Sequence, residues 1–331
     1  MSETHHEDGS QRVFHSEPHT SGIDTGRKRK PPKNLADGMI KALRPKQWVK
    51  NVLVLAAPAA AGADALFHSR VLLDVLLAFI VFCMGASSIY LINDARDVEA
   101  DRAHPTKRFR PIAAGVLPVG LAYAMAALLI VGSIGLSFLA TAGPQLAIVM
   151  AVYIALQLGY CFGWKHMPVI DIALVSSGFM LRTMAGGVAA GIVLSQWFLL
   201  VAAFGSLFMA SGKRYSEILL AERTGAKIRK SLEGYTPTYL RFVWTLAATA
   251  LVMSYSLWGF QLSNAADGPA SVWYQVSMVP FTIAVLRYAA DVDRGNGGAP
   301  DEIALEDRAL QVLALLWLAC IAMAVYIIPM L

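Results

Sequence analysis

Nine stretches of almost uninterrupted apolar residues restrict what this chain can fold into. Most approach the roughly 20 residues that an α-helix needs to cross a lipid bilayer. Charged residues make up only 15% of the 331 positions, whereas a typical soluble domain has about 25%. The sequence therefore predicts an all-α integral membrane protein with about nine transmembrane helices. The stretches cover about residues 52–66, 70–92, 118–140, 144–162, 168–190, 195–212, 239–262, 272–289 and 309–330.

The first 34 residues differ in composition from the rest of the chain. They are rich in Ser, Gly, His, Pro and charged residues and cannot bury enough apolar surface to fold alone. No apolar segment of the signal-peptide type follows the basic residues 27–30, which are expected to lie against anionic lipid head groups. We therefore predict a disordered tail over residues 1–34 and one transmembrane domain over residues 35–331.

Lysine and arginine indicate the orientation in the membrane. All but two of the 28, Arg70 and Arg182, lie in the N-terminal segment or at the loops after the second, fourth, sixth and eighth helices. Because cytoplasmic loops carry such an excess, we predict that the N-terminus and these loops are cytoplasmic in a plasma membrane. An odd number of helices would place the C-terminus on the other side.

Cysteine and histidine form no pattern that indicates catalysis, disulfides or zinc. Cys83, Cys161 and Cys320 all fall within apolar stretches and are expected to be small residues of the protein core. His5 and His6 lie in the polar tail, where they are expected to be solvated.

The second apolar stretch runs directly into the acidic string Asn93-Asp-Ala-Arg-Asp-Val-Glu-Ala-Asp101. On a continuous helix Asp94, Asp97 and Asp101 would share one face, with Asn93 beside it. Like charges on one face repel unless cations neutralise them, and Mg²⁺ favours a few carboxylates together with substrate phosphates. These four residues are therefore predicted Mg²⁺ ligands, and the three aspartates are predicted catalytic residues. A solvated, charged helix end is the alternative.

Basic residues follow this string at once, between His104 and Gly115. Lys107 and Arg110 beside a carboxylate–metal cluster would suit the oxygens of a diphosphate, because Arg binds phosphate bidentately. An ordinary positive-inside loop explains Arg108 equally well.

The string from Asn93 to Gly115 resembles the first aspartate-rich signature of the UbiA superfamily of membrane prenyltransferases. The resemblance covers nearly all of the chain after about residue 40. It implies nine spanning helices around a polar cavity that faces the cytoplasm, with a lateral opening to lipid. The second motif of the family is usually a pair of aspartates. Asp171 matches the first and is a candidate catalytic residue, but Val175 stands one turn later.

Further charged motifs lie at predicted helix ends. Lys46 and Lys50, at positions i and i+4, would share a helix face before the first apolar stretch. Another group closes the sixth helix, and a third fills the loop before the ninth, with Arg287, Asp291, Asp293, Arg294, Asp301, Glu302, Glu306, Asp307 and Arg308. All three are expected to converge on the cytoplasmic cavity. The predicted substrate-binding residues are Lys46, Lys50, Asn93, Lys107, Arg110, Arg182, Lys213, Arg214 and Tyr215.

Arg182 stands apart because it lies eleven residues beyond Asp171, about 16 Å along the helix. An arginine at that depth normally faces a cavity or a partner. A structural contact and a phosphate contact are both compatible with its position.

Together these motifs resemble the branch of the superfamily that transfers phosphoribosyl groups in the synthesis of actinobacterial cell-wall arabinan precursors. This resemblance implies a pentosyltransferase with phosphoribosyl pyrophosphate as donor and a polyprenyl (decaprenyl) phosphate as acceptor. The acceptor is already an anion near neutral pH, so no strong general base is expected. Membrane lipids are expected partners and nucleic acid is not, and a homo-oligomer is compatible with the pattern.

Two other functions are weighed against this one. A conventional prenyltransferase would move a prenyl group from a prenyl diphosphate to an aromatic acceptor, but Val175 and the additional basic motifs disfavour it. A membrane transporter is disfavoured because its site would normally lie near the bilayer midplane, where these helices have few polar residues.

Overall fold

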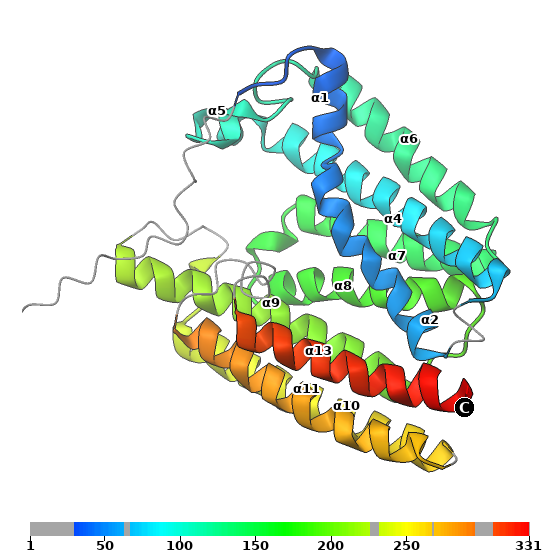
Figure 1. Cartoon of the computed structure of the whole chain (residues 1–331). Helices are drawn as coiled ribbons and strands as arrows, with labels where there is room; N and C mark the ends of the chain where they lie inside the picture. Colours follow the sequence, from blue (N-terminus) through cyan, green and yellow to red (C-terminus); the bar gives the residue numbers. More distant parts are fainter. Residues whose placement is uncertain (1–29, 63–66, 226–231, 267, 295–306, 331) are drawn as a thin grey trace, which may run out of the picture.

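The computed structural model describes residues 30–62, 67–225, 232–266, 268–294 and 307–330. Within these ranges the chain forms helices and connecting turns and contains no β-strand (Figure 1). Several residues discussed above lie outside the described ranges, namely 1–29 with His5 and His6, and Asp301, Glu302 and Glu306.

Within the described ranges, eight long helices form the body of the molecule. They are α4 (Ser69–Arg96), α6 (Val119–Ser137), α7 (Gly143–Cys161), α8 (Ile170–Ala189), α9 (Gln196–Thr224), α10 (Pro237–Ala265), α11 (Ala270–Asp293) and α13 (Arg308–Ala322). The shorter elements are α1 (Leu35–Ala42), η1 (Pro45–Leu55), α2 (Ala56–Ala60), α5 (Val98–Ala103), η2 (Lys107–Phe109), η3 (Trp164–His166), η5 (Met323–Ile327) and η6 (Ile328–Met330).

The predicted apolar stretches coincide with these helices. Six helices of the described chain are long and apolar enough to cross a membrane: α4, α6, α7, α8, α10 and the helix over Arg308–Ile327. The lengths of α9 and α11, 29 and 24 residues, are also sufficient for a span of roughly 20 residues. An all-helical membrane protein is therefore confirmed, whereas nine spans stays a prediction.

The first apolar stretch is not one α-helix. A 3₁₀-helix, η1, continues directly into the five-residue α2. Pro45 opens η1 and Pro58 lies within α2, and proline removes a backbone donor from the hydrogen-bond ladder. Because a 3₁₀-helix has three residues per turn, positions i and i+4 no longer align. The expectation that Lys46 and Lys50 share one face is therefore wrong.

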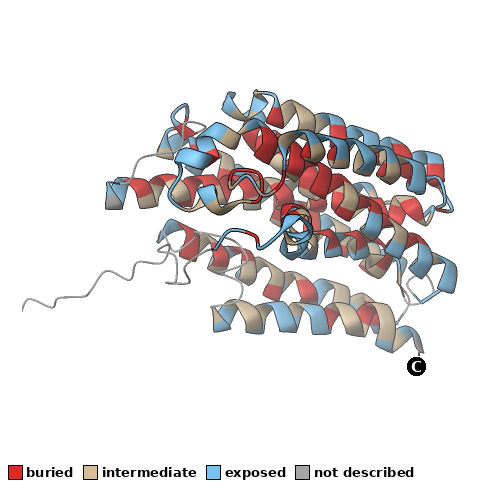
Figure 2. Cartoon of the chain, turned by 90° about the horizontal axis from the view of Figure 1, so that it is seen from above, coloured by how far each residue is buried: buried red, intermediate tan, exposed pale blue. Residues whose placement is uncertain are grey.

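The long helices pack as two neighbouring groups, which α8 and α9 join (Figure 1). One group contains α4, α6, α7 and α8 with η1 and α2 against them, and the other contains α9, α10, α11 and α13. Buried residues line the facing sides of the helices and exposed residues the outside (Figure 2). The three cysteines are unpaired and buried, as predicted.

Small residues bring α8 unusually close to the first segment. A Cβ atom built on Gly186 would lie 1.8 Å from the carbonyl oxygen of Val54, and one on Gly187 would lie 2.8 Å from Ala57 Cβ. Only a residue without a side chain fits such an approach. These glycines therefore set the distance between α8 and η1–α2.

Most ion pairs gather at one end of the bundle. They join successive elements there, so that α4 is linked to η3, α8 to α9, and α11 to the residue that precedes α13. We call this the charged end and define it by Asp94, Asp97, Asp171, Arg214 and Asp307. It corresponds to the face at which the sequence predicts the chemistry.

Candidate active site

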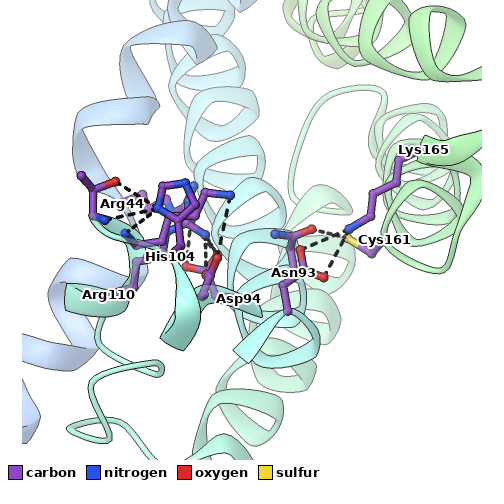
Figure 3. Close-up of polar contacts among 11 residues, drawn as sticks. Arg44, Asn93, Asp94, His104, Arg110, Cys161 and Lys165 are labelled. Carbon is purple, nitrogen blue, oxygen red and sulfur yellow. Dashed lines mark hydrogen bonds and ion pairs between the residues drawn. The ribbon is translucent and has the colours of Figure 1, made fainter. Parts of the chain in front are cut away.

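Asp94 lies near the end of α4 and is enclosed by two arginines. Arg44 Nη2 donates to both carboxylate oxygens, at 2.6 and 2.7 Å, and Arg110 Nη1 donates to Oδ1 at 3.0 Å. Arg110 also donates to Asp101 Oδ2 at 2.7 Å, so it bridges two carboxylates. Figure 3 shows Arg44 and Arg110 beside Asp94. Asp94 and Asp101 are both only 3% exposed, and such buried carboxylates require partners of opposite charge. We call Asp94, Asp101, Arg44 and Arg110 the first ionic centre.

Asn93 and Asp97 point away from this centre. Figure 3 shows Asn93 directed toward Cys161 and Lys165, on the other side of α4 from Arg44 and Arg110. Lys165 Nζ lies 3.3 and 3.1 Å from the two oxygens of Asp97. The expectation of one shared acidic face is therefore wrong. Asn93 and Asp94 are consecutive residues of α4 and therefore point about 100° apart around the helix. The helix then breaks at Asp97, whose ψ of 12° separates α4 from α5, which carries Asp101.

The residues fit a hard divalent cation by the chemistry of their donors, because three carboxylates and an amide offer only oxygen ligands. The described residues, however, contain no group of three His, Cys, Asp or Glu side chains close enough to hold a metal ion. Each of the three carboxylates has a basic partner instead. A metal with its diphosphate would therefore replace existing ion pairs rather than enter a preformed cage.

Asp171 begins α8 and forms a second ionic centre with Arg214 of α9. The carboxylate is fully buried. Arg214 Nε donates to Oδ2 at 3.1 Å and Nη2 donates to Oδ1 at 3.2 Å. Arg214 Nη1 donates to Glu217 Oε2 at 3.2 Å. Val169, two residues before Asp171, has a φ of 70°, a strained conformation for a β-branched residue.

Arg182 lies inside the first helix group, and its hydrogen-bond acceptors are neutral. Nε donates to Asn51 Oδ1, Nη1 to the carbonyl oxygen of Gly178 and Nη2 to the hydroxyl of Tyr153, at 2.7, 2.7 and 2.9 Å. The guanidinium also lies over the rings of Phe82 and Tyr153, a geometry that stabilises cations. Arg182 therefore joins η1, α7 and α8, and a contact with substrate stays a prediction.

The other predicted substrate-binding residues differ in their exposure and in their contacts. Lys107 Nζ lies 3.9 Å from Asp101 Oδ1. Lys46 is exposed, and Lys50 and Lys213 are half-buried. Tyr215 donates its hydroxyl to Asp293 Oδ1 at 3.0 Å, so the hydroxyl is engaged between α9 and α11.

A separate group links α11 to the start of α13. Arg287 Nε donates to Asp307 Oδ2 at 2.5 Å, and Asp307 Oδ1 accepts from the amides of Ala309 and Leu310. The hydrogen bond from Arg287 lowers the pKa of Asp307 to about 2. These contacts serve the junction of two helices, so this motif is not part of the two ionic centres.

Arg44 and Lys165 contact the predicted acids directly, although neither was a predicted site residue. Arg44 precedes Pro45 and has a φ of 53°, a backbone region that costs energy outside glycine and is often found at functional sites. The Arg-Pro pair was a visible signal for a turn. Its partner Asp94 lies 50 residues away, which no local pattern reveals.

Comparisons with known proteins show the family to which the sequence is similar. The model of the UbiA prenyltransferase family matches residues 51–305. The chain is 78% identical to the decaprenyl-phosphate phosphoribosyltransferase of Corynebacterium glutamicum, over 98% of each chain. It is 64% identical to the Mycolicibacterium smegmatis protein of that name, over 89% of this chain and 95% of that one.

Solved structures show the same fold at low sequence identity. A UbiA homolog from Archaeoglobus fulgidus bound to GPP and Mg²⁺ superposes with a TM-score of 0.61 at 16% identity, covering 88% of this chain and 99% of the other. An apo UbiA homolog from Aeropyrum pernix gives a TM-score of 0.55 at 14% identity, with the same coverage.

Proposed function

The chain belongs to the UbiA prenyltransferase family, and we propose that it transfers 5-phosphoribosyl from phosphoribosyl pyrophosphate to a polyprenyl phosphate such as decaprenyl phosphate. The observation that carries this proposal is the 78% identity over 98% of both chains with a decaprenyl-phosphate phosphoribosyltransferase. The first ionic centre supports it, because guanidinium groups and carboxylates together can hold a metal-bound diphosphate.

In this reaction the bond between the anomeric carbon of ribose and the pyrophosphate oxygen breaks. A phosphate oxygen of the lipid forms the new bond, and pyrophosphate leaves. The acceptor phosphate is an anion near neutral pH, so no side chain has to remove a proton. This agrees with the described part of the charged end, where arginine, lysine and carboxylates predominate.

At the end of α4 and in α5, Asn93, Asp94, Asp97 and Asp101 are the residues that would hold Mg²⁺, Asp94 and Asp101 from the first ionic centre and Asn93 and Asp97 from the side that faces Lys165 (Figure 3). When bound, Mg²⁺ would neutralise the leaving pyrophosphate as negative charge develops on it. Arg44, Arg110 and Lys107 already lie beside the carboxylates, and they would bind phosphate oxygens of the substrate. Lys46, Lys50 and Lys213 would reduce the repulsion between the two phosphate-bearing substrates.

The proposed setting is the cytoplasmic face of the plasma membrane, where the lipid product would enter cell-wall arabinan synthesis. The distribution of lysine and arginine supports this orientation. The polyprenyl tail would stay among the apolar helices, while its phosphate reaches the charged end.

A double-label assay tests the reaction. Purified protein is incubated with Mg²⁺, a polyprenyl phosphate and phosphoribosyl pyrophosphate that carries ¹⁴C in the ribose and ³²P in the β-phosphate. We expect ¹⁴C in the lipid fraction and an equal molar amount of ³²P in released pyrophosphate. If ¹⁴C stays out of the lipid while a prenyl diphosphate alkylates an aromatic acid, the protein is a conventional prenyltransferase.

A further inference from the structure

The two ionic centres at the charged end are built differently. In the first, the basic partners come from outside the long helices and are partly exposed, with side chains of Arg44 and Arg110 at 27% and 28%. In the second, Arg214 projects from the middle of α9 with a side chain only 10% exposed, and Asp171 is fully buried. Substrate can therefore reach Arg44 and Arg110 and displace them from the carboxylates. The pair of Arg214 and Asp171, in contrast, is fixed in the protein.

Arg214 occupies both oxygens of Asp171. Nε and Nη2 each bind a different oxygen, and Nη1 binds Glu217. This fork uses all three nitrogen atoms of the guanidinium, and a planar, permanently charged group is well suited to such a buried arrangement. Removing the cation would leave a buried carboxylate without a counter-charge, which proteins tolerate poorly.

The second centre offers too few oxygen ligands for a divalent cation. Mg²⁺ requires near-octahedral coordination by oxygen. Val175, one helical turn after Asp171, contributes an apolar side chain and no oxygen ligand. Glu217 is the additional carboxylate, and it is engaged by Arg214. The residues at Asp171 therefore do not fit a metal ion.

The second centre nevertheless lies near the acidic string at the end of α4. Two consecutive residues at the end of α7 lie between them: Tyr160 interacts electrostatically with Arg214, and Cys161 Sγ lies 3.9 Å from Asn93 Oδ1. Arg214 thus lies on the Asn93 side of the acidic residues at the end of α4, and its own carboxylate partners are Asp171 and Glu217.

We propose that Arg214 occupies the place of a metal ion at Asp171, so that this active site binds a single divalent cation, at the end of α4. The inference rests on the proposed function, because it assumes a diphosphate at the first ionic centre. Asp171 is then a positioning residue that holds Arg214, and it does not bind a metal.

Metal counting tests this inference without measuring turnover. The full-length protein in detergent is dialysed to equilibrium against Mn²⁺ and inorganic pyrophosphate, and manganese is counted per chain in excess over the protein-free compartment. We expect about one Mn²⁺ in the wild type, about one in Asp171→Asn and none in Asp94→Asn. A wild-type count of two that falls to one in Asp171→Asn would overturn the inference.

A gain-of-site variant provides a second readout. Val175→Asp combined with Arg214→Ser removes the guanidinium and supplies a second carboxylate one turn from Asp171, so the count should rise to about two. Arg214→Lys, the matched control, keeps a cation and should stay at one. A count of one in a double variant that elutes as a folded protein would contradict the replacement of a metal by Arg214.

The result of the metal count can be interpreted independently of the assay for phosphoribosyl transfer. Pyrophosphate is the probe in the metal count, so the count does not depend on the identity of the acceptor. Failure of ribose label to enter the lipid would refute the phosphoribosyl transfer and leave the metal stoichiometry interpretable.

Discussion

Asp94 has the most constrained surroundings of the acidic residues at the end of α4. It is almost completely buried and receives hydrogen bonds from two guanidinium groups. Charge-assisted bonds of this kind are short and strong, so Asp94 holds Arg44 and Arg110 in place. The carboxylate therefore has two functions that can be separated by mutation, to orient these arginines and to contribute an oxygen to a cation.

Replacing Asp94 by asparagine keeps the size of the side chain and removes its charge. We expect phosphoribosyl transfer to fall by on the order of 100-fold or more, the loss typical for removal of one preorganised electrostatic group. The initial rate of label transfer to lipid measures this. The matched control is Glu99→Gln in the adjacent α5, because the Glu99 side chain is 81% exposed and pairs only with Arg102 among described residues. Equal rates in both variants would contradict a role for Asp94 in the reaction.

At the scale of elements, the contact between α8 and η1 depends on the absence of a side chain. Gly186→Ala would place a methyl group 1.8 Å from a backbone oxygen, and neither backbone can yield without moving a helix. Overpacking of this kind costs about 1–3 kcal/mol and occasionally more. We therefore expect a lower thermal unfolding temperature in detergent.

The control for this prediction is Gly135→Ala in α6, where a new Cβ meets nothing within 4 Å. Alanine favours the helix over glycine by roughly 1 kcal/mol, so stability should stay equal or rise. If both alanine variants melted at the same temperature, the close approach of α8 and η1 would not be a determinant of stability.

The junction of α11 and α13 has a dependence on pH that can be derived from Asp307. Arg287 and the helix amides lower the pKa of Asp307 from 3.8 to about 2, so the folded state favours the ionised carboxylate. The resulting stabilisation is fully present above about pH 4 and is lost as the pH falls toward 2. It should therefore be constant between pH 5 and 8.

Asp307→Asn tests this behaviour, because asparagine still caps a helix but carries no charge. We expect the variant to melt at a lower temperature than the wild type at pH 7, and the two melting temperatures to converge below pH 4. The measurement is thermal unfolding in detergent across this range. A difference that is the same at pH 7 and pH 3 would show that the charge of Asp307 does not stabilise the junction.

At the scale of the whole molecule, the positions of the long helices in the sequence were largely predictable. Each spanning segment must be apolar along its own length, so local composition locates it. The pairs that build the charged end were not predictable in this way, since Asp94 and Arg44 lie 50 residues apart and Asp171 and Arg214 lie 43 apart. The break at Asp97 also carries no proline or glycine signal, and it separates Asp101, in α5, from the helix that carries Asp94.

The orientation in the membrane is the last property that the sequence predicts and that an experiment can decide. Basic residues cluster at the charged end, and the positive-inside rule places such loops in the cytoplasm. Glu99 lies at this end. Val193, in the turn between α8 and α9, lies toward the other end and is 94% exposed. The native cysteines are buried, so labelling of an introduced cysteine will be visible above the background.

We therefore expect a membrane-impermeant maleimide to label Val193→Cys in intact cells. Glu99→Cys should be labelled only after the membrane is permeabilised, or in inside-out vesicles. Both positions are on the protein surface, so a difference between them reports the side of the membrane rather than burial. The reverse pattern would place the charged end outside the cell. Phosphoribosyl pyrophosphate made in the cytoplasm would then be unable to reach Asp94, because the bilayer excludes so highly charged a molecule.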